Sequence, residues 1–154
     1  MTAAADLHAL QGSELGVSAW RPLDQATVDT HAATTGDAQW IHNDPERASR
    51  EGPFGGPIAQ GFLLLALFTE LASQAIPPFD GLAYLVNYGF DRVRFVRPVA
   101  VGDKVRLRVR LDDVRTRADG AWILTFDAQL ERASDGAVAV AARWLFLAAE
   151  RGDA

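Results

Sequence analysis

Two side chains that could carry acid–base chemistry, Asp37 and His42, lie close together in the segment TGDAQWIHND, residues 35–44. A carboxylate and an imidazole held near each other can share one water molecule, with one group acting as base and the other as acid. The same residues also fit a plainer interpretation, in which Asp37 is a turn residue after Gly36 and His42 is a polar residue ahead of a helix cap. The spacing alone leaves both interpretations open.

The backbone N–H of Gly61 could serve as a donor to a developing negative charge. It lies at the start of a long apolar segment. If that segment is a helix that begins near Ala59 or Gln60, the N–H of Gly61 belongs to the first turn, whose donors have no partner within the helix. Such a donor, together with the helix dipole, can stabilise an oxyanion. Close packing of Gly61 against a sheet is the alternative explanation for a glycine here.

Other kinds of site find little support in the sequence. The absence of cysteine excludes a thiolate metal site and a cysteine nucleophile. One central histidine with scattered carboxylates does not form a recognisable metal-ligand pattern, so we expect no metal and no cofactor. No serine lies in a nucleophile elbow, and no glycine-rich loop could cradle a phosphate. The net charge of −5 argues against a nucleic-acid partner.

The composition indicates one folded domain. The chain has 154 residues, of which 49% are hydrophobic and 23% charged, which fits a single domain and is too apolar for disorder. The longest strictly apolar run, residues 62–68, is much shorter than the roughly 20 residues that span a bilayer. The N-terminus lacks the features of a secretory signal. We therefore expect a cytoplasmic protein without a membrane partner, formed by one domain over residues 1–154 in which residues 1–13 are peripheral.

Capping residues indicate two short helices in the first half of the chain. Asp24 is an N-cap for a helix over residues 25–34, which Gly36 ends. Asp44 is followed by proline and glutamate, a combination that favours a second helix over residues 45–50. The segment that contains Asp37 and His42 then lies between a helix end and a helix start, where we expect a constrained loop.

The rest of the chain predicts a sheet and one buried helix. Alternating apolar and polar residues predict three long strands, separated by Asp-Gly turns, at residues 104–111, 122–130 and 138–146, and shorter strands at 83–88 and 93–96. Residues 58–75 are apolar on every side and predict a long helix that must be covered. An α+β fold, in which an antiparallel meander wraps around this central helix, satisfies both patterns. One such sheet leaves an edge strand and part of the helix open, so we expect a homodimer.

Several motifs occur in the order and spacing of the MaoC-like dehydratases. They are TGD at 35–37, QWIH at 39–42, DPER at 44–47, GPFG at 52–55, IAQGF at 58–62, VNYG at 86–89, RVRF at 92–95 and VGD at 101–103. Over residues 14–148 the chain resembles in particular the short single-domain branch, the NodN-like and (R)-specific enoyl-CoA hydratases. The resemblance implies a hot-dog fold, a homodimer and a role in fatty acid metabolism. It also implies syn addition of water to a trans-2-enoyl-CoA, which gives the (R)-3-hydroxyacyl-CoA.

The resemblance assigns roles to individual residues of this sequence. The catalytic aspartate and histidine fall on Asp37 and His42, and the glycine whose N–H binds the thioester oxygen falls on Gly61. A hydroxyl position further along the helix falls on Thr69. Gln60 stands where relatives commonly carry histidine, and we expect this difference to affect support or substrate choice more than reaction class.

Position along the chain suggests further substrate contacts. Trp40 and Phe54 could form walls for the acyl chain. The CoA phosphates need cations near the mouth of the site, and the candidates are Arg92, Arg94 and Arg97.

Two other functions remain open at this point. A hot-dog acyl-CoA thioesterase would use a carboxylate on the long helix, where Glu70 is the only acid. A non-catalytic acyl-CoA-binding dimer would be consistent with Gln60 in place of histidine.

Overall fold

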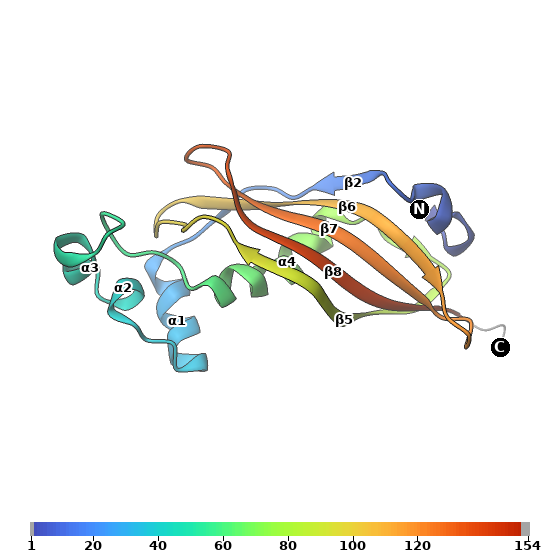
Figure 1. Ribbon diagram of the computed structural model, residues 1–154, viewed down its shortest axis with the longest axis horizontal. Helices are drawn as coiled ribbons and strands as arrows, with labels where there is room; N and C mark the ends of the chain where they lie inside the picture. The colour runs from blue at the N-terminus through green and yellow to red at the C-terminus, as the bar shows by residue number, and fades with distance from the viewer. Residues whose placement is uncertain (1, 152–154) are drawn as a thin grey trace.

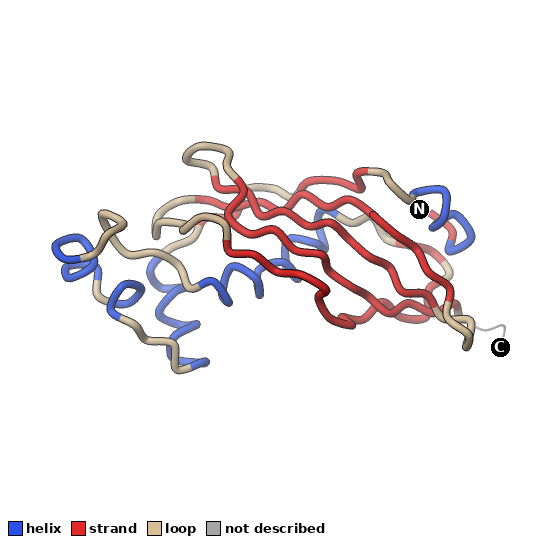
Figure 2. Tube along the Cα trace, viewed as in Figure 1, coloured by secondary structure: helices blue, strands red, loops and turns tan. Residues whose placement is uncertain are grey.

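The computed structural model describes residues 2–151 and places a long helix along one face of a curved sheet, with three short helices beyond one end (Figure 1). The helices are η1 (Ala4–Leu10), α1 (Gln25–Thr35), α2 (Trp40–Asn43), α3 (Pro45–Glu51) and α4 (Gly61–Ala75). The strands are β1 (Thr2–Ala3), β2 (Glu14–Val17), β3 (Arg21–Pro22), β4 (Phe79–Asp80), β5 (Leu82–Phe95), β6 (Lys104–Thr116), β7 (Trp122–Arg132) and β8 (Val138–Glu150). This arrangement of a sheet around a helix confirms the predicted α+β class (Figure 2).

The main sheet has six strands in the order β2-β6-β7-β8-β5, with β3 also paired to β6. The hairpins that join β6, β7 and β8 turn at Gly120 and Gly136, whose φ angles of 83° and 70° are available to glycine at little cost. Both predicted Asp-Gly turns are therefore confirmed. The predicted meander is wrong for β5, because this strand pairs with β8 and not with its successor β6.

Strand β5 is one long strand where the sequence predicted two short ones. Its pairing with β8 shifts register between Leu82 and Tyr84, Asn87 and Gly89, and Phe90 and Arg92. These irregularities interrupt the alternation of apolar and polar residues, which explains why the pattern looked like separate strands. β5 also lies at the edge of the sheet, and its outward residues include large exposed side chains such as Val86 and Tyr88.

The helix α4 begins at Gly61, three residues later than predicted. Residues 58–60 are extended because they pair with the segment that leads into β6: Ile58 bridges to Ala100, and the N–H of Ala59 donates to the carbonyl oxygen of Val99 at 2.9 Å. Backbone pairing thus keeps residues 58–60 extended, although their apolar pattern predicted a helix. The predicted start of α4 is corrected, and Gln60 becomes its N-cap residue.

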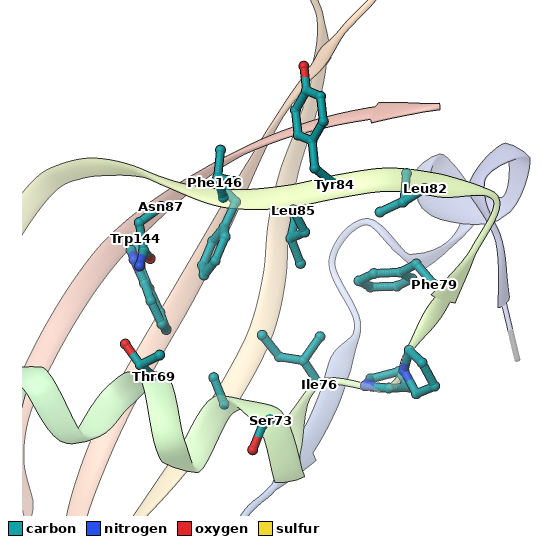
Figure 3. A pocket seen from close by; sticks show the side chains of 14 residues that line it. Thr69, Ser73, Ile76, Phe79, Leu82, Tyr84, Leu85, Asn87, Trp144 and Phe146 are labelled. Carbon is teal, nitrogen blue, oxygen red and sulfur yellow. The ribbon is translucent and has the colours of Figure 1, made fainter. Parts of the chain in front are cut away.

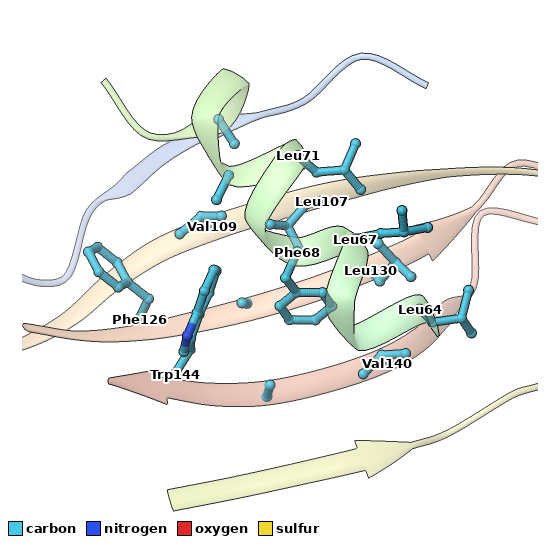
Figure 4. Packing of buried hydrophobic residues seen from close by; sticks show 14 of the residues in the cluster. Leu64, Leu67, Phe68, Leu71, Leu107, Val109, Phe126, Leu130, Val140 and Trp144 are labelled. Carbon is cyan, nitrogen blue, oxygen red and sulfur yellow. The ribbon is translucent and has the colours of Figure 1, made fainter. Parts of the chain in front are cut away.

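The core lies between α4 and the inner face of the sheet (Figure 4). The buried side of α4 packs on inward-facing side chains of β6, β7 and β8; the cluster includes Leu64, Leu67, Phe68, Leu71, Leu107, Val109, Phe126, Leu130, Val140 and Trp144. The helix is not covered on every side, since Phe62 is 69% exposed. One flank of α4 is therefore open in the single chain.

The N-terminal segment is less peripheral than expected. Leu7 in η1 is 1% exposed and belongs to the core cluster. The N–H of Gly12 donates to the carbonyl oxygen of Leu111 on β6 at 2.7 Å. Among the described residues, no helix has the length and hydropathy needed to cross a membrane.

Candidate active site

The caps of α1 and α3 hold the ends of the segment that contains Asp37 and His42. The carboxylate of Asp24 accepts a hydrogen bond from the N–H of Thr27 at 2.9 Å, and α1 ends at Gly36 with φ of 80°. The carboxylate of Asp44 accepts from the N–H of Arg47 at 3.0 Å at the start of α3. All three predicted capping residues are confirmed.

The intervening segment is more ordered than the predicted loop, because residues 40–43 form the short helix α2. Asp37 lies in the link before α2, and His42 lies within it. In Figure 1, α1, α2 and α3 gather around the end of α4 that carries Gly61. The sequence could not predict α2, since it is a single helical turn without a side-chain cap.

His42 is 6% exposed and its imidazole is fixed by one hydrogen bond. Its Nδ1 atom lies 2.7 Å from the carbonyl oxygen of Ile58. A carbonyl oxygen can only accept, so Nδ1 must carry the hydrogen. In the neutral ring, Nε2 is then unprotonated and available as a base or as a hydrogen-bond acceptor.

Gln60 is fully buried and contacts the backbone of the same segment. Its Nε2 atom donates to the carbonyl oxygens of Asp37 and Val28, both at 3.2 Å. The side chain thus connects α1 to the link that carries Asp37. These contacts are those of a supporting residue, one of the two roles expected for Gln60.

Gly61 is the first residue of α4, so its N–H has no acceptor within the helix. The side chain of the N-cap residue Gln60 does not cap the helix either. A Cβ atom at Gly61 would lie 3.1 Å from Cδ1 of Phe95, which is tighter than an ordinary contact. The carbonyl oxygen of Ile58 binds the ring of His42, and the side chain of Gln60 binds the backbone of Asp37. Residues 58–61 therefore hold Asp37 and His42, the predicted catalytic dyad, near the start of α4.

A cavity of about 730 Å³ lies at the other end of α4, between this helix and strands β5 and β8. Figure 3 shows Thr69 of α4 and Ile76, the residue after this helix, projecting toward Leu85, Trp144 and Phe146. Thr69, one of the predicted substrate-binding residues, lines the end of this cavity that is nearest the middle of α4. The remaining lining is mostly apolar, which suits a hydrocarbon chain.

Trp40 and Phe54, which the sequence predicted as walls for the acyl chain, lie outside the lining of this cavity. The guanidinium carbon of Arg47 lies 4.5 Å from the centre of the Trp40 ring, in a cation–π contact. Phe54 is an exposed side chain in the turn between α3 and α4.

Arg92 and Arg94 line a separate hollow together with Arg143 and Asp112. Both arginines flank Val93, which packs against the core from β5. Since neighbouring residues of a strand face opposite sides, the two arginines face the outer side of the sheet, away from α4. The prediction that they lie at the mouth of the site is not met within the single chain.

Three polar residues that the sequence analysis did not single out also hold this region. Gln25 on α1 donates to the carbonyl oxygen of His42 at 2.8 Å and to the carboxylate of Asp29 at 2.9 Å. Asn43 on α2 donates to the same carboxylate oxygen at 2.6 Å. The only sequence signal was the spacing of Gln25 and Asp29, four residues apart on one helix face.

Comparison with known proteins places the chain in a family. The model of the family described as "MaoC like domain" matches residues 7–122. The chain belongs to this MaoC-like family. It is 41% identical over 144 residues to Nodulation protein N of Rhizobium meliloti (strain 1021), a match that covers 94% of this chain and 89% of that protein. It is 42% identical over 127 residues to 3-hydroxyacyl-thioester dehydratase Z of Mycobacterium tuberculosis (strain ATCC 25618 / H37Rv), which covers 82% of this chain and 83% of that protein.

Among solved structures, this MaoC-like protein is similar to the (R)-hydratase from A. caviae, described as involved in PHA biosynthesis. The TM-score is 0.71 and the identity 28%, with 88% of this chain and 97% of that chain covered. The predicted hot-dog fold is confirmed, as is the resemblance to MaoC-like dehydratases. The similar proteins include dehydratases and hydratases, which supports a hydro-lyase type of enzyme.

Proposed function

We propose that this MaoC-like protein is an (R)-specific enoyl-CoA hydratase, which also runs in reverse as a 3-hydroxyacyl-CoA dehydratase. The observation that carries the proposal is the arrangement around residues 58–61. His42 is held there with Nε2 free, the backbone of Asp37 is tied to Gln60, and the N–H of Gly61 is open at the helix start. In the proposed mechanism, the imidazole of His42 and the carboxylate of Asp37 form the acid–base pair, and the N–H of Gly61 is the oxyanion donor.

The proposed reaction uses one water molecule. Asp37 and His42 hold this water and take up one of its protons as its oxygen bonds to C3 of the trans-2-enoyl thioester. The electrons of the double bond shift toward the thioester oxygen, which gains negative charge and accepts a hydrogen bond from the N–H of Gly61. A proton from the same pair then bonds to C2. Both additions occur from one face, so the hydration is syn. The face of C3 that the pair attacks sets the configuration, and the proposed product is the (R)-3-hydroxyacyl-CoA.

The acyl chain is proposed to lie along α4, from Gly61 toward the cavity at Thr69. Eight residues separate the two positions, which is about 12 Å along a helix. Substrates with a short acyl chain therefore end before the cavity, and longer chains reach its apolar lining. The CoA moiety extends in the other direction, out of the site.

The alternative of a thioesterase is weakened by the environment of Glu70. Its carboxylate accepts a hydrogen bond from Nε of Arg21 at 2.9 Å and is 52% exposed at the side chain. This carboxylate is engaged in an ion pair with Arg21 and does not line the cavity beside α4. Asp37 and His42 therefore provide the better candidate chemistry.

The proposed functional unit is a homodimer that forms along the free edge of β5. This strand is at the end of the sheet and carries exposed apolar side chains, among them Tyr84, Val86 and Tyr88. An unpaired edge of this length is normally covered. A second copy would pair with the edge and cover the open flank of α4, and we expect it to bury more than about 1,000 Å². A sedimentation mass equal to one chain at micromolar concentration would contradict this.

The decisive experiment is incubation of the purified protein with crotonyl-CoA. Loss of the enoyl absorbance without release of thiol is the expected result, and chiral analysis should identify the (R)-3-hydroxy product. Release of free thiol would instead indicate a thioesterase. Binding without either change would indicate a non-catalytic acyl-CoA-binding protein.

A further inference from the structure

Two glutamine side chains contact the two residues of the proposed dyad through their backbone carbonyl groups. Nε2 of Gln60 lies 3.2 Å from the carbonyl oxygen of Asp37, and Nε2 of Gln25 lies 2.8 Å from that of His42. Because both acceptors are carbonyl oxygens, the NH₂ end of each amide must face the segment. Each member of the dyad is thus held by a different side chain.

Both glutamines connect the dyad to α1. Gln60 reaches the carbonyl oxygen of Val28 on this helix at 3.2 Å. Gln25 is itself on α1 and donates to Asp29 one turn further along, at 2.9 Å. The same carboxylate oxygen accepts from Asn43, the neighbour of His42, at 2.6 Å. The segment between α1 and α3 is therefore bound to α1 both near Asp37 and near His42.

These contacts leave several buried acceptors unpaired. In the part of the chain that the structure describes, five buried side-chain polar atoms have no partner, and three of them are the amide oxygens of Gln25, Asn43 and Gln60. An unpaired buried acceptor is unfavourable, and native folds contain few. The oxygens of Gln25 and Gln60 have no partner because the NH₂ groups face the backbone of His42 and Asp37, and the oxygen of Asn43 has none because its NH₂ group faces Asp29.

We propose that Gln25 and Gln60 are positioning residues, which set the separation of Asp37 and His42 by holding their backbone. The inference rests on the proposed function of the dyad. Gln60 acts through Asp37, and Gln25 acts through His42. Asp29 is the common anchor of Gln25 and Asn43.

The test uses Gln25→Met and Gln60→Met, which keep the length of each side chain and remove its donors. With crotonyl-CoA, each variant is expected to lose about 10–100-fold in kcat with KM nearly unchanged, since small displacements of reacting groups have effects of this size. Gln74→Met is the matched control. The Gln74 amide oxygen accepts a backbone hydrogen bond from Ala19, 3.2 Å away and remote from the dyad, and this variant is expected to keep wild-type kcat.

A second set of variants separates positioning from general destabilisation. In an Asp37→Asn background, Gln60→Met is expected to cause little further loss, because the residue through which it acts is already inactive. Gln25→Met is expected to behave in the same way in a His42→Asn background. A further loss as large as that in the wild-type protein would overturn the proposal. Gln25 is only partly buried, so its replacement should be tolerated. Gln25→Met therefore provides the same test if Gln60→Met does not fold.

The outcomes also separate this inference from the proposed function. If Asp37→Asn and His42→Asn retain wild-type hydration, the dyad itself is wrong. If these two variants lose activity and the glutamine variants match Gln74→Met, the dyad stands and the positioning role is overturned.

Discussion

The Nδ1 atom of His42 lies 2.7 Å from the carbonyl oxygen of Ile58, three residues before the start of α4. This bond fixes the tautomer of the imidazole, since only a protonated Nδ1 can donate to a carbonyl. It also places the ring beside residues 58–61, in which Gln60 binds the backbone of Asp37 and Gly61 begins α4. One hydrogen bond therefore orients the proposed base and connects it to the segment that carries the proposed oxyanion donor, Gly61.

This bond determines which substitution of His42 is informative. Asparagine can place an N–H near the position of Nδ1 and keep the bond to Ile58, but it has no counterpart of Nε2. We expect His42→Asn to lower kcat by about 10²–10⁴, the usual contribution of a positioned acid–base group, with a nearly unchanged melting temperature. His42→Ala should also lose stability, by about 1–3 kcal/mol, because it leaves the carbonyl of Ile58 unpaired. Kinetics with crotonyl-CoA and thermal unfolding measure the two effects.

Asp37→Asn is expected to produce a loss of similar size, because it removes the negative charge and keeps the shape of the side chain. If both residues act on one water molecule, the double variant should be little worse than either single variant. Losses that multiply would show that the two residues act in separate steps. KM should change little in all three proteins.

Gly61→Ala tests the proposed oxyanion donor. The added Cβ would lie 3.1 Å from Cδ1 of Phe95 and would narrow the space in front of the helix start. We expect kcat to fall by about 10²–10³-fold, the usual loss when one oxyanion-hole contact is removed. Gly56→Ala is the control, because its Cβ would meet Ser49 Oγ at an ordinary 3.9 Å. Return of activity when Phe95→Leu is added would assign the loss to crowding by this ring.

Glu131 predicts a pH-dependent contribution to stability on the outer face of the sheet. Its side chain is 11% exposed and accepts hydrogen bonds from Arg106 at 2.7 Å and from Arg108 at 2.9 Å. Burial alone would raise the pKa of Glu131, but the hydrogen bonds from Arg108 and Arg106 outweigh it and hold this pKa below its ordinary value. A carboxyl with a lowered folded-state pKa stabilises the fold above its unfolded-state pKa. This stabilisation is lost as the pH falls through the folded-state pKa.

Glu131→Gln is therefore expected to lower the free energy of unfolding at neutral pH by about 1.5–3 kcal/mol, the usual value of a hydrogen bond to a charged group. Urea unfolding at neutral and at acid pH measures this difference between variant and wild type, which should shrink at acid pH. Glu14→Gln is the matched control: Glu14 also pairs with Arg108, but its side chain is 52% exposed and its removal should have a small effect. A difference that is constant with pH would contradict the assignment.

The sequence predicted those parts of the fold that depend on local patterns. The three long strands, the turns at Gly120 and Gly136, and the caps at Asp24 and Asp44 each have a signal within a few residues. Long-range pairing was not predictable in this way. The position of β5 beside β8, and the extended backbone before Gly61, depend on partners far away in the sequence.

For the site, the motifs pointed to Asp37, His42 and Gly61 and included Gln60, but gave no sign of Gln25, Asp29 and Asn43, which also hold this segment. Gln25 and Asn43 are polar residues on helices, and the pattern of such residues looks like a solvated surface. Arg92 and Arg94 were predicted to contact the CoA phosphates from their position along the sequence alone. The side of the sheet that a residue faces depends on register, and the bulge between Phe90 and Arg92 changes that register just before them.

The cavity at the far end of α4 predicts how acyl chain length affects the reaction. Figure 3 shows Thr69 projecting from α4 toward Trp144 on β8, at the side of the cavity nearer to Gly61. A large side chain at position 69 would close this entrance. Thr69 is exposed in the single chain, so its replacement should not disturb the core.

We expect Thr69→Phe to hydrate crotonyl-CoA at nearly the wild-type rate but to lose about 10–100-fold in kcat/KM with trans-2-dodecenoyl-CoA. Burial of each CH₂ group contributes about 0.8 kcal/mol, so exclusion of two or three such groups has an effect of this size. Thr69→Val is the control, because it removes the hydroxyl and keeps the volume, and it should accept both substrates. Equal losses with the short and the long substrate would mean that position 69 contacts the reacting end of the molecule. The acyl chain would then leave the helix before the cavity, and the cavity would have no part in chain selection.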